Sequence, residues 1–162
     1  MDETLAAAVA ALRAGGVVAY PTEAVWGLGC DPRDEAAFAR VFALKRRPPA
    51  HGVLLIAADF GQLLPYIDLD ATPAAARVRA LATWPGPHTW VFPRAAGVPA
   101  WIAGAHAGIA LRVTAHTPAA ALCRAFGGEL VSTRAKRHGE APARSRNEVD
   151  AMFRERVDAM LK

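Results

Sequence analysis

The sequence lacks the features that define several common protein classes. Its 162 residues include only two cysteines, Cys30 and Cys123, which cannot by themselves form a disulfide scaffold or a zinc site. No apolar run approaches the roughly 20 residues that a membrane-spanning helix needs. The first residues, Met1-Asp2-Glu3, are acidic, unlike the start of a secretory signal. We therefore expect a cytoplasmic protein with two reduced thiols in its core.

The chain also lacks the short motifs of common nucleotide and metal sites. It contains no G-x-x-x-x-G-K-[ST] or G-x-G-x-x-G phosphate loop, no H-E-x-x-H and no paired C-x-x-C. Ser132 has no flanking glycines, so it does not resemble the nucleophile of an α/β-hydrolase. These absences argue against a standard phosphate loop, a zinc enzyme and a serine hydrolase.

What the chain does contain is a large apolar fraction and unevenly placed positive charge. Hydrophobic residues make up 53% and charged residues 21% of the sequence, which excludes intrinsic disorder, and the length fits one domain. The formal net charge is +4. Basic side chains gather at two places, which are Lys45–Arg47 and the stretch 134–146 with Arg134, Lys136, Arg137, His138, Arg144 and Arg146. Composition leaves two interpretations open, solvated loops or an anion site for nucleotide phosphates or RNA.

Helical and strand patterns alternate along the chain, which predicts an α/β layered domain. Expected helices cover residues 3–14, 34–45, 72–83 and 117–128, with a short one after Asp59 and a last one that follows the capping box Ser145–Glu148 and extends its apolar stripe to Met160. Thr72 is the expected N-cap of the third. Expected strands cover residues 17–20, 53–57, 89–92, 109–113 and 129–133, and residues 93–107 are expected to be a loop.

Several strand-to-loop transitions are rich in hydroxyl groups and cations. They are Tyr20–Glu23 with Trp26–Gly29, Lys45–Pro48, Pro85–Thr89, Ala110–Val113 and Ser132–Lys136. Ligands of α/β sheets bind beyond strand ends, but turns use the same residue types. Each transition alone is weak evidence for a ligand site. The order and spacing of the transitions together are more specific.

That order resembles the YrdC-like family, the TsaC-type threonylcarbamoyl-AMP synthases of tRNA modification. The resemblance covers about residues 6–153. It implies an α/β (α+β) fold, a single domain with a twisted mixed sheet flanked by helices around a basic cavity. It also implies that L-threonine, bicarbonate and ATP, with Mg²⁺ expected beside ATP, give L-threonylcarbamoyl-AMP and pyrophosphate. A partner complex then transfers the threonylcarbamoyl group to adenosine 37 of tRNA, forming t6A, while direct tRNA binding is a secondary expectation.

The resemblance also implies roles for individual residues. Lys45 and Arg47 would act in catalysis by holding phosphates of ATP, and the further ATP-binding residues would be Arg112, Ser132, Thr133 and Arg144. Thr22 and Thr89 would hold threonine through their hydroxyl groups. His51 either contacts a phosphate or faces solvent. No metal ligand is assigned, and Glu23 and Asp31 are either candidates for Mg²⁺ or structural residues.

The chain departs from the family pattern at two places. The family carries Ser-Ala-Asn where this chain has Arg134-Ala135-Lys136, and Arg and Lys side chains donate hydrogen bonds but do not accept them. These cations either add phosphate contacts to an active enzyme or leave a catalytically impaired nucleotide- or RNA-binding protein. The family also continues with a further strand and a glycine-containing segment, so we expect the domain of residues 1–162 to lack that segment.

Overall fold

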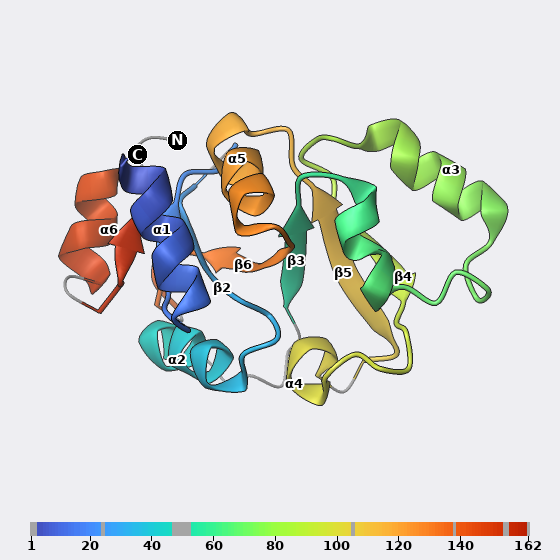
Figure 1. Ribbon diagram of the computed structural model, residues 1–162, viewed down its shortest axis with the longest axis horizontal. Helices are drawn as coiled ribbons and strands as arrows, with labels where there is room; N and C mark the ends of the chain where they lie inside the picture. Colours follow the sequence, from blue (N-terminus) through green and yellow to red (C-terminus); the bar gives the residue numbers. More distant parts are fainter. Residues whose placement is uncertain are drawn as a thin grey trace.

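A mixed β-sheet runs through the computed structural model, which describes residues 3–23, 25–46, 53–104, 106–137, 139–153 and 156–161 (Figure 1). The sheet has seven strands in the order β4-β5-β3-β6-β2-β1-β7. The strands are β1 Val18–Tyr20, β2 Gly27–Cys30, β3 Leu54–Ala57, β4 Trp90–Pro93, β5 Gly108–Val113, β6 Leu130–Arg134 and β7 Ala159–Met160. The helices are α1 Glu3–Arg13, α2 Glu35–Lys45, the 3-10 helix η2 Phe60–Tyr66, α3 Ala74–Thr83, α4 Ala100–Ala103, α5 Thr117–Phe126 and α6 Arg146–Phe153.

The pairing of the strands is mostly antiparallel. Two pairs are parallel, β3 with β5 and β1 with β7, and the remaining neighbours run antiparallel. In the centre of the sheet Ser132 of β6 lies between Gly29 of β2 and Leu54 of β3. The mixed sheet with flanking helices confirms the expected fold class.

Each face of the sheet has its own hydrophobic cluster. One cluster joins residues of α1 and α5 to Val18, Tyr20, Ile56 and Leu130. The other joins residues of α2, α4 and α6 to alternate positions of the same strands. Side chains alternate between the two faces of a strand, so one short strand supplies both clusters. In Figure 1 α1 and α5 lie in front of the sheet, and α3 projects to the right, away from it.

Local sequence signals mark where several helices begin or end, as the sequence predicts. The Asp34 carboxylate accepts a hydrogen bond of 3.0 Å from the Ala37 amide and caps α2. Gly127 follows α5 with φ of 87°, a left-handed conformation that glycine adopts without strain. Asp59 likewise caps η2 through the Gln62 amide. Among the residues that the structure describes, no helix has the length and apolar character needed to cross a membrane.

Four of our expectations about local structure were wrong. Strand β2 was not expected, because Gly27 and Gly29 have low strand propensity; it forms between β1 and β6. Residues 100–103 form α4 inside the expected loop. The last helix ends at Phe153 and Met160 lies in β7, which pairs with β1. The N-cap of α3 is Pro73, and the Thr72 hydroxyl bonds the Asp68 carbonyl instead.

Candidate active site in a cavity at the sheet edge

A cavity of about 710 Å³ opens where β2, β3 and β5 begin and β6 ends. This volume is within the roughly 300–1,000 Å³ of small-molecule sites. The lining residues come from six segments of the chain. They are Thr22, Val25, Trp26, Gly27, Val53, Leu54, Val91, Ile102, Ala103, His106, Ala107, Gly108, Ile109, Ala110, Arg112, Ser132, Thr133 and Arg134. The charged residues in this set, Arg112 and Arg134, are both cationic.

Thr22 lines the cavity from the loop that follows β1. Its hydroxyl donates a hydrogen bond of 2.5 Å to the Val25 carbonyl within the same loop. A hydroxyl has one proton and two lone pairs. With its proton used on Val25, the Thr22 oxygen offers the cavity an acceptor rather than a donor.

Ser132 and Thr133 line the cavity from the end of β6. Ser132 is buried, and its Oγ accepts a hydrogen bond of 2.7 Å from the hydroxyl of Tyr20, which has no exposed surface. Burial raises the pKa of the Tyr20 phenol. The phenol therefore stays protonated and can donate this hydrogen bond.

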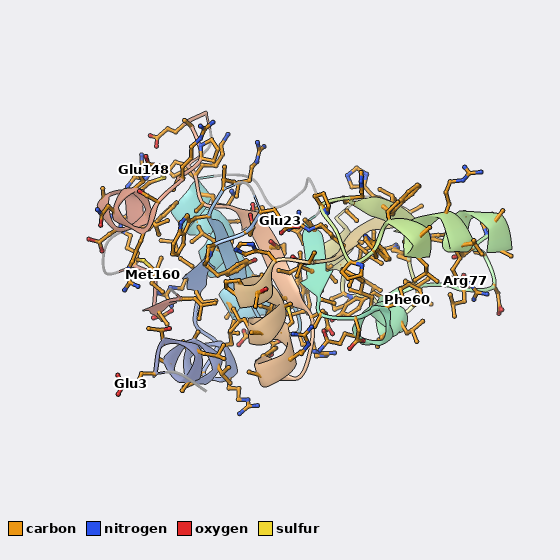
Figure 2. The ribbon with its side chains drawn as sticks, turned by 90° about the horizontal axis from the view of Figure 1, so that it is seen from above. Glu3, Glu23, Phe60, Arg77, Glu148 and Met160 are labelled. Atoms are coloured by element: carbon orange, nitrogen blue, oxygen red, sulfur yellow. The ribbon has the colours of Figure 1, made fainter. Side chains whose placement is uncertain are left out.

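Arg112 reaches the cavity from the interior of β5. Its Nη2 lies 3.9 Å from the Glu23 carboxylate, and the Thr114 hydroxyl donates to the same carboxylate oxygen at 3.1 Å. Figure 2 labels Glu23 near the centre of the molecule. The Arg112 Nε is buried and makes no hydrogen bond to any described residue. The Arg112 side chain is 14% exposed and lines the cavity, so its charge is available to an anion there.

Lys45 and Arg134 meet at the wall of the cavity. Lys45 ends α2 and is 3% exposed, and its Nζ donates a hydrogen bond of 2.6 Å to the main-chain carbonyl of Arg134. Arg134 lines the cavity and its side chain is exposed. The Lys45 ammonium group thus lies beside the cavity even though Lys45 does not belong to the lining set.

The remaining site candidates lie elsewhere. Thr89 and Arg144 are exposed and Lys136 is half-buried, and none of them belongs to the lining set. Thr89 directly precedes Trp90, which pairs with Leu111, the neighbour of Arg112 in β5. Arg47 and His51 fall outside the residues that the structure describes.

Several lining residues were not expected from the sequence. His106, Ile102 and Ala103 come from the segment that was expected to be a featureless loop, and Val91 comes from β4. No local motif marks these residues, because they reach the cavity only when α4 packs below β5. Only Gly108 gives a weak indication among these residues, because a Cβ at position 108 would lie 2.5 Å from the Val91 side chain and glycine is needed for this close approach.

The carboxylates near the cavity do not form a metal cage. Glu23 is engaged by Thr114 and lies near Arg112, while Asp31 follows β2 at the end opposite the cavity and accepts from the Arg33 amide. Within the described ranges, no group of three or more His, Cys, Asp or Glu side chains could hold a metal ion. The described residues therefore offer no cluster of three protein side chains that would hold Mg²⁺ by itself.

Two curated proteins of similar sequence carry the same name. This chain is 51% identical over 154 residues to the threonylcarbamoyl-AMP synthase of Xanthomonas euvesicatoria, covering 95% of this chain and 82% of the relative. It is 52% identical over 158 residues to the protein of the same name from Stenotrophomonas maltophilia, covering 98% and 85%.

Solved structures of similar proteins share the fold of this chain. P. abyssi Sua5 complexed with L-threonine superposes with a TM-score of 0.89 at 31% identity over 96% of this chain. The chain spans only 45% of that protein. E. coli YciO matches with a TM-score of 0.84 at 26% identity, covering 96% of this chain and 75% of YciO. The model of the Sua5/YciO/YrdC family, described as telomere recombination, matches residues 10–162. The chain belongs to the Sua5/YciO/YrdC family.

Proposed function

We propose that this chain is a threonylcarbamoyl-AMP synthase, which makes L-threonylcarbamoyl-AMP and pyrophosphate from L-threonine, bicarbonate and ATP. The observation that carries the proposal is the cavity in which Thr22, Ser132, Thr133 and Arg112 converge. It occurs in a chain about half identical to curated relatives with that name.

The proposed reaction has two bond-forming steps. The threonine amine forms a C–N bond with carbon dioxide and releases a proton, or with bicarbonate and releases water, to give a carbamate. A carbamate oxygen then attacks the α-phosphorus of ATP, and the bond from that phosphorus to the bridging oxygen breaks to release pyrophosphate. Negative charge develops on the phosphoryl oxygens and on the leaving group, so fixed cations and correct positioning supply most of the catalysis. No covalent nucleophile is needed.

The donors and acceptors of the cavity suit these substrates. The Thr22 oxygen, whose proton is used on Val25, would accept a hydrogen bond from the threonine amine. Arg112, which lines the cavity, would donate to phosphate oxygens, and Ser132 and Thr133 would contact the nucleotide. Lys45 would lie at the cavity wall close to the phosphates, and Arg47 would join it as a phosphate ligand. Thr89 and Arg144 would reach bound substrate from outside the lining set.

The wider assignments are also part of the proposal. Because the described carboxylates do not form a metal cage, Mg²⁺ would arrive with the ATP phosphates. We expect the protein to act in the cytoplasm, where Cys30 and Cys123 stay reduced. The product would pass to a transfer complex that modifies adenosine 37 of tRNA to t6A, with tRNA itself a secondary partner.

Pyrophosphate release tests the proposed activity. We expect release from ATP that depends on both threonine and bicarbonate. Arg112→Gln should lower the rate by about 100-fold, because it removes a cation aimed at the developing charge. Arg79→Gln is the matched control, since Arg79 is exposed on α3 and does not line the cavity; its rate should stay unchanged. Release that is no faster than in a blank without threonine would refute the activity.

A binding protein without turnover is the second candidate, and Arg134 is the observation that favours it. Its long cationic side chain lies at the cavity wall where the family has a serine. ATP binding without threonine-dependent pyrophosphate release would support this candidate. RNA binding that weakens as salt rises would indicate phosphate contacts.

A further inference from the structure

Tyr20 makes a contact that the proposed reaction does not use directly. Tyr20 belongs to β1, and its hydroxyl lies 2.7 Å from the Oγ of Ser132 in β6. Strand β2 lies between β1 and β6 in the sheet. The tyrosine side chain therefore crosses a whole strand to reach the cavity residue.

The crossing is possible because the strand in between carries glycines. Tyr20 pairs with Gly27, and Ser132 pairs with Gly29, so all four residues share one face of the sheet. A Cβ on Gly27 would meet the Tyr20 ring at 3.1 and 3.2 Å. A Cβ on Gly29 would meet the ring at 2.9 Å and the Val131 carbonyl at 2.5 Å. The two glycines thus form the surface on which the buried ring lies.

The hydrogen bond decides which way the Ser132 hydroxyl acts. When Ser132 Oγ accepts from Tyr20, its own proton is free for a partner in the cavity. Ser132 then presents a donor to the cavity, while Thr22 presents an acceptor. A donor suits phosphate and carboxylate oxygens, which only accept.

We propose that Tyr20 is a positioning residue, which lies on Gly27 and Gly29 and orients the Ser132 hydroxyl as a hydrogen-bond donor to the nucleotide. The ligand part of this inference rests on the proposed function, whereas the contact between Tyr20 and Ser132 does not. The same inference explains why a strand in the middle of the sheet carries two glycines at alternate positions.

Tyr20→Phe removes the hydroxyl and keeps the ring on its glycine surface. We expect ATP binding, measured by titration calorimetry, to weaken by about tenfold, the value of one lost hydrogen bond to a charged ligand. Ser132→Ala should weaken binding by a similar factor. If Tyr20 acts through Ser132, the double variant binds no worse than Ser132→Ala alone. A simple structural role of Tyr20 would instead make the two effects multiply.

Tyr66→Phe is the matched control for the loss of a buried phenol. Tyr66 is 4% exposed, donates to Glu129 at 2.5 Å and does not line the cavity. This variant should lower stability and leave ATP binding within about twofold of wild type. Tyr20→Phe binding ATP as tightly as wild type, or a multiplicative double variant, would overturn the positioning role.

Urea unfolding gives a readout that needs no ligand. Gly27→Ala should lower the urea midpoint in the wild-type chain but much less in a Tyr20→Leu background, because the nearest atoms to its Cβ belong to the ring. Equal losses in both backgrounds would overturn the role of Gly27. A wild-type chain that binds no ATP would refute the proposed function. Even then, the effects of Tyr20→Phe and Ser132→Ala on the urea midpoint should be non-additive, because the two hydroxyl groups are in contact. Additive effects there would overturn the contact itself.

Discussion

The ammonium group of Lys45 donates a 2.6 Å hydrogen bond to the main-chain carbonyl of Arg134. This bond joins the C-terminal end of α2 to the end of β6, and so links two of the motifs that the sequence singles out. Because the acceptor is a main-chain oxygen, the bond does not depend on which side chain occupies position 134. The departure from the family pattern at Arg134 therefore leaves this link intact.

Arg134→Ser should alter ATP binding and leave the fold unchanged. The Arg134 side chain is exposed at the cavity wall, so its removal should change the free energy of unfolding by less than about 0.5 kcal/mol. It should raise the KM for ATP about fivefold, the value of one exposed charge contact, and less at high salt. Steady-state kinetics at two salt concentrations measure this.

The control for Arg134 is Arg146→Ser, because Arg146 is exposed and does not line the cavity. Its KM for ATP should match that of wild type. Lys136→Asn should have a smaller effect than Arg134→Ser, since Lys136 is also outside the lining set. Activity that rises in Arg134→Ser would show that the cation obstructs the site.

Asp158 holds the last strand to the rest of the sheet. Its carboxylate forms an ion pair with Arg40 and accepts a hydrogen bond of 2.8 Å from the Val17 amide. Burial raises the pKa of Asp158, but the bonds from Arg40 and Val17 outweigh it and leave the pKa below its usual value. Asp158→Asn should therefore lower the free energy of unfolding at pH 7, by about 1 kcal/mol for this partly exposed pair.

The loss in Asp158→Asn should depend on pH with a defined sign. The folded pKa lies below the unfolded one of about 3.9, so the contribution is complete above that value and disappears as pH falls through the folded pKa. Urea unfolding of both chains at several pH values measures it. A difference that grows toward low pH would contradict the assignment.

The two cysteines should be unreactive in the folded protein. Both side chains have no exposed surface, and burial raises the pKa of each thiol to about 12. At pH 8 the thiolate fraction is then about 10⁻⁴, and the thiolate is the reactive form. A colorimetric thiol reagent should detect neither cysteine in the native chain and both after denaturation. Rapid reaction of the native chain would contradict this burial.

Two positions of α3 that lie two residues apart should differ in how much stability they lose when a carboxylate is introduced. Val78 is 66% exposed and Ala80 is 1% exposed, on a helix that projects from the sheet (Figure 1). Val78→Asp should change the free energy of unfolding by less than about 0.5 kcal/mol. Ala80→Asp should cost at least about 2 kcal/mol, because it buries a carboxylate. Similar losses for both would show that α3 packs differently.

Local sequence signals predicted most helices and strands. The Asp34 cap, the glycine after α5 and the apolar spacing of α1 act within a few residues, so they can be recognised without the fold. The ordered motifs also identified the family, which the comparisons confirm.

The tertiary structure decided the features that depend on residues far apart in the chain. Strand β2 forms despite its glycines because β1 and β6 flank it and the Tyr20 ring needs the space. Met160 is a strand residue because β1 offers it a free edge. The cavity itself is assembled from six segments, including α4 and His106, and no local pattern can show which of them meet. Sequence by itself determined most of the elements and the family, whereas packing between distant segments decided the remaining elements and the site.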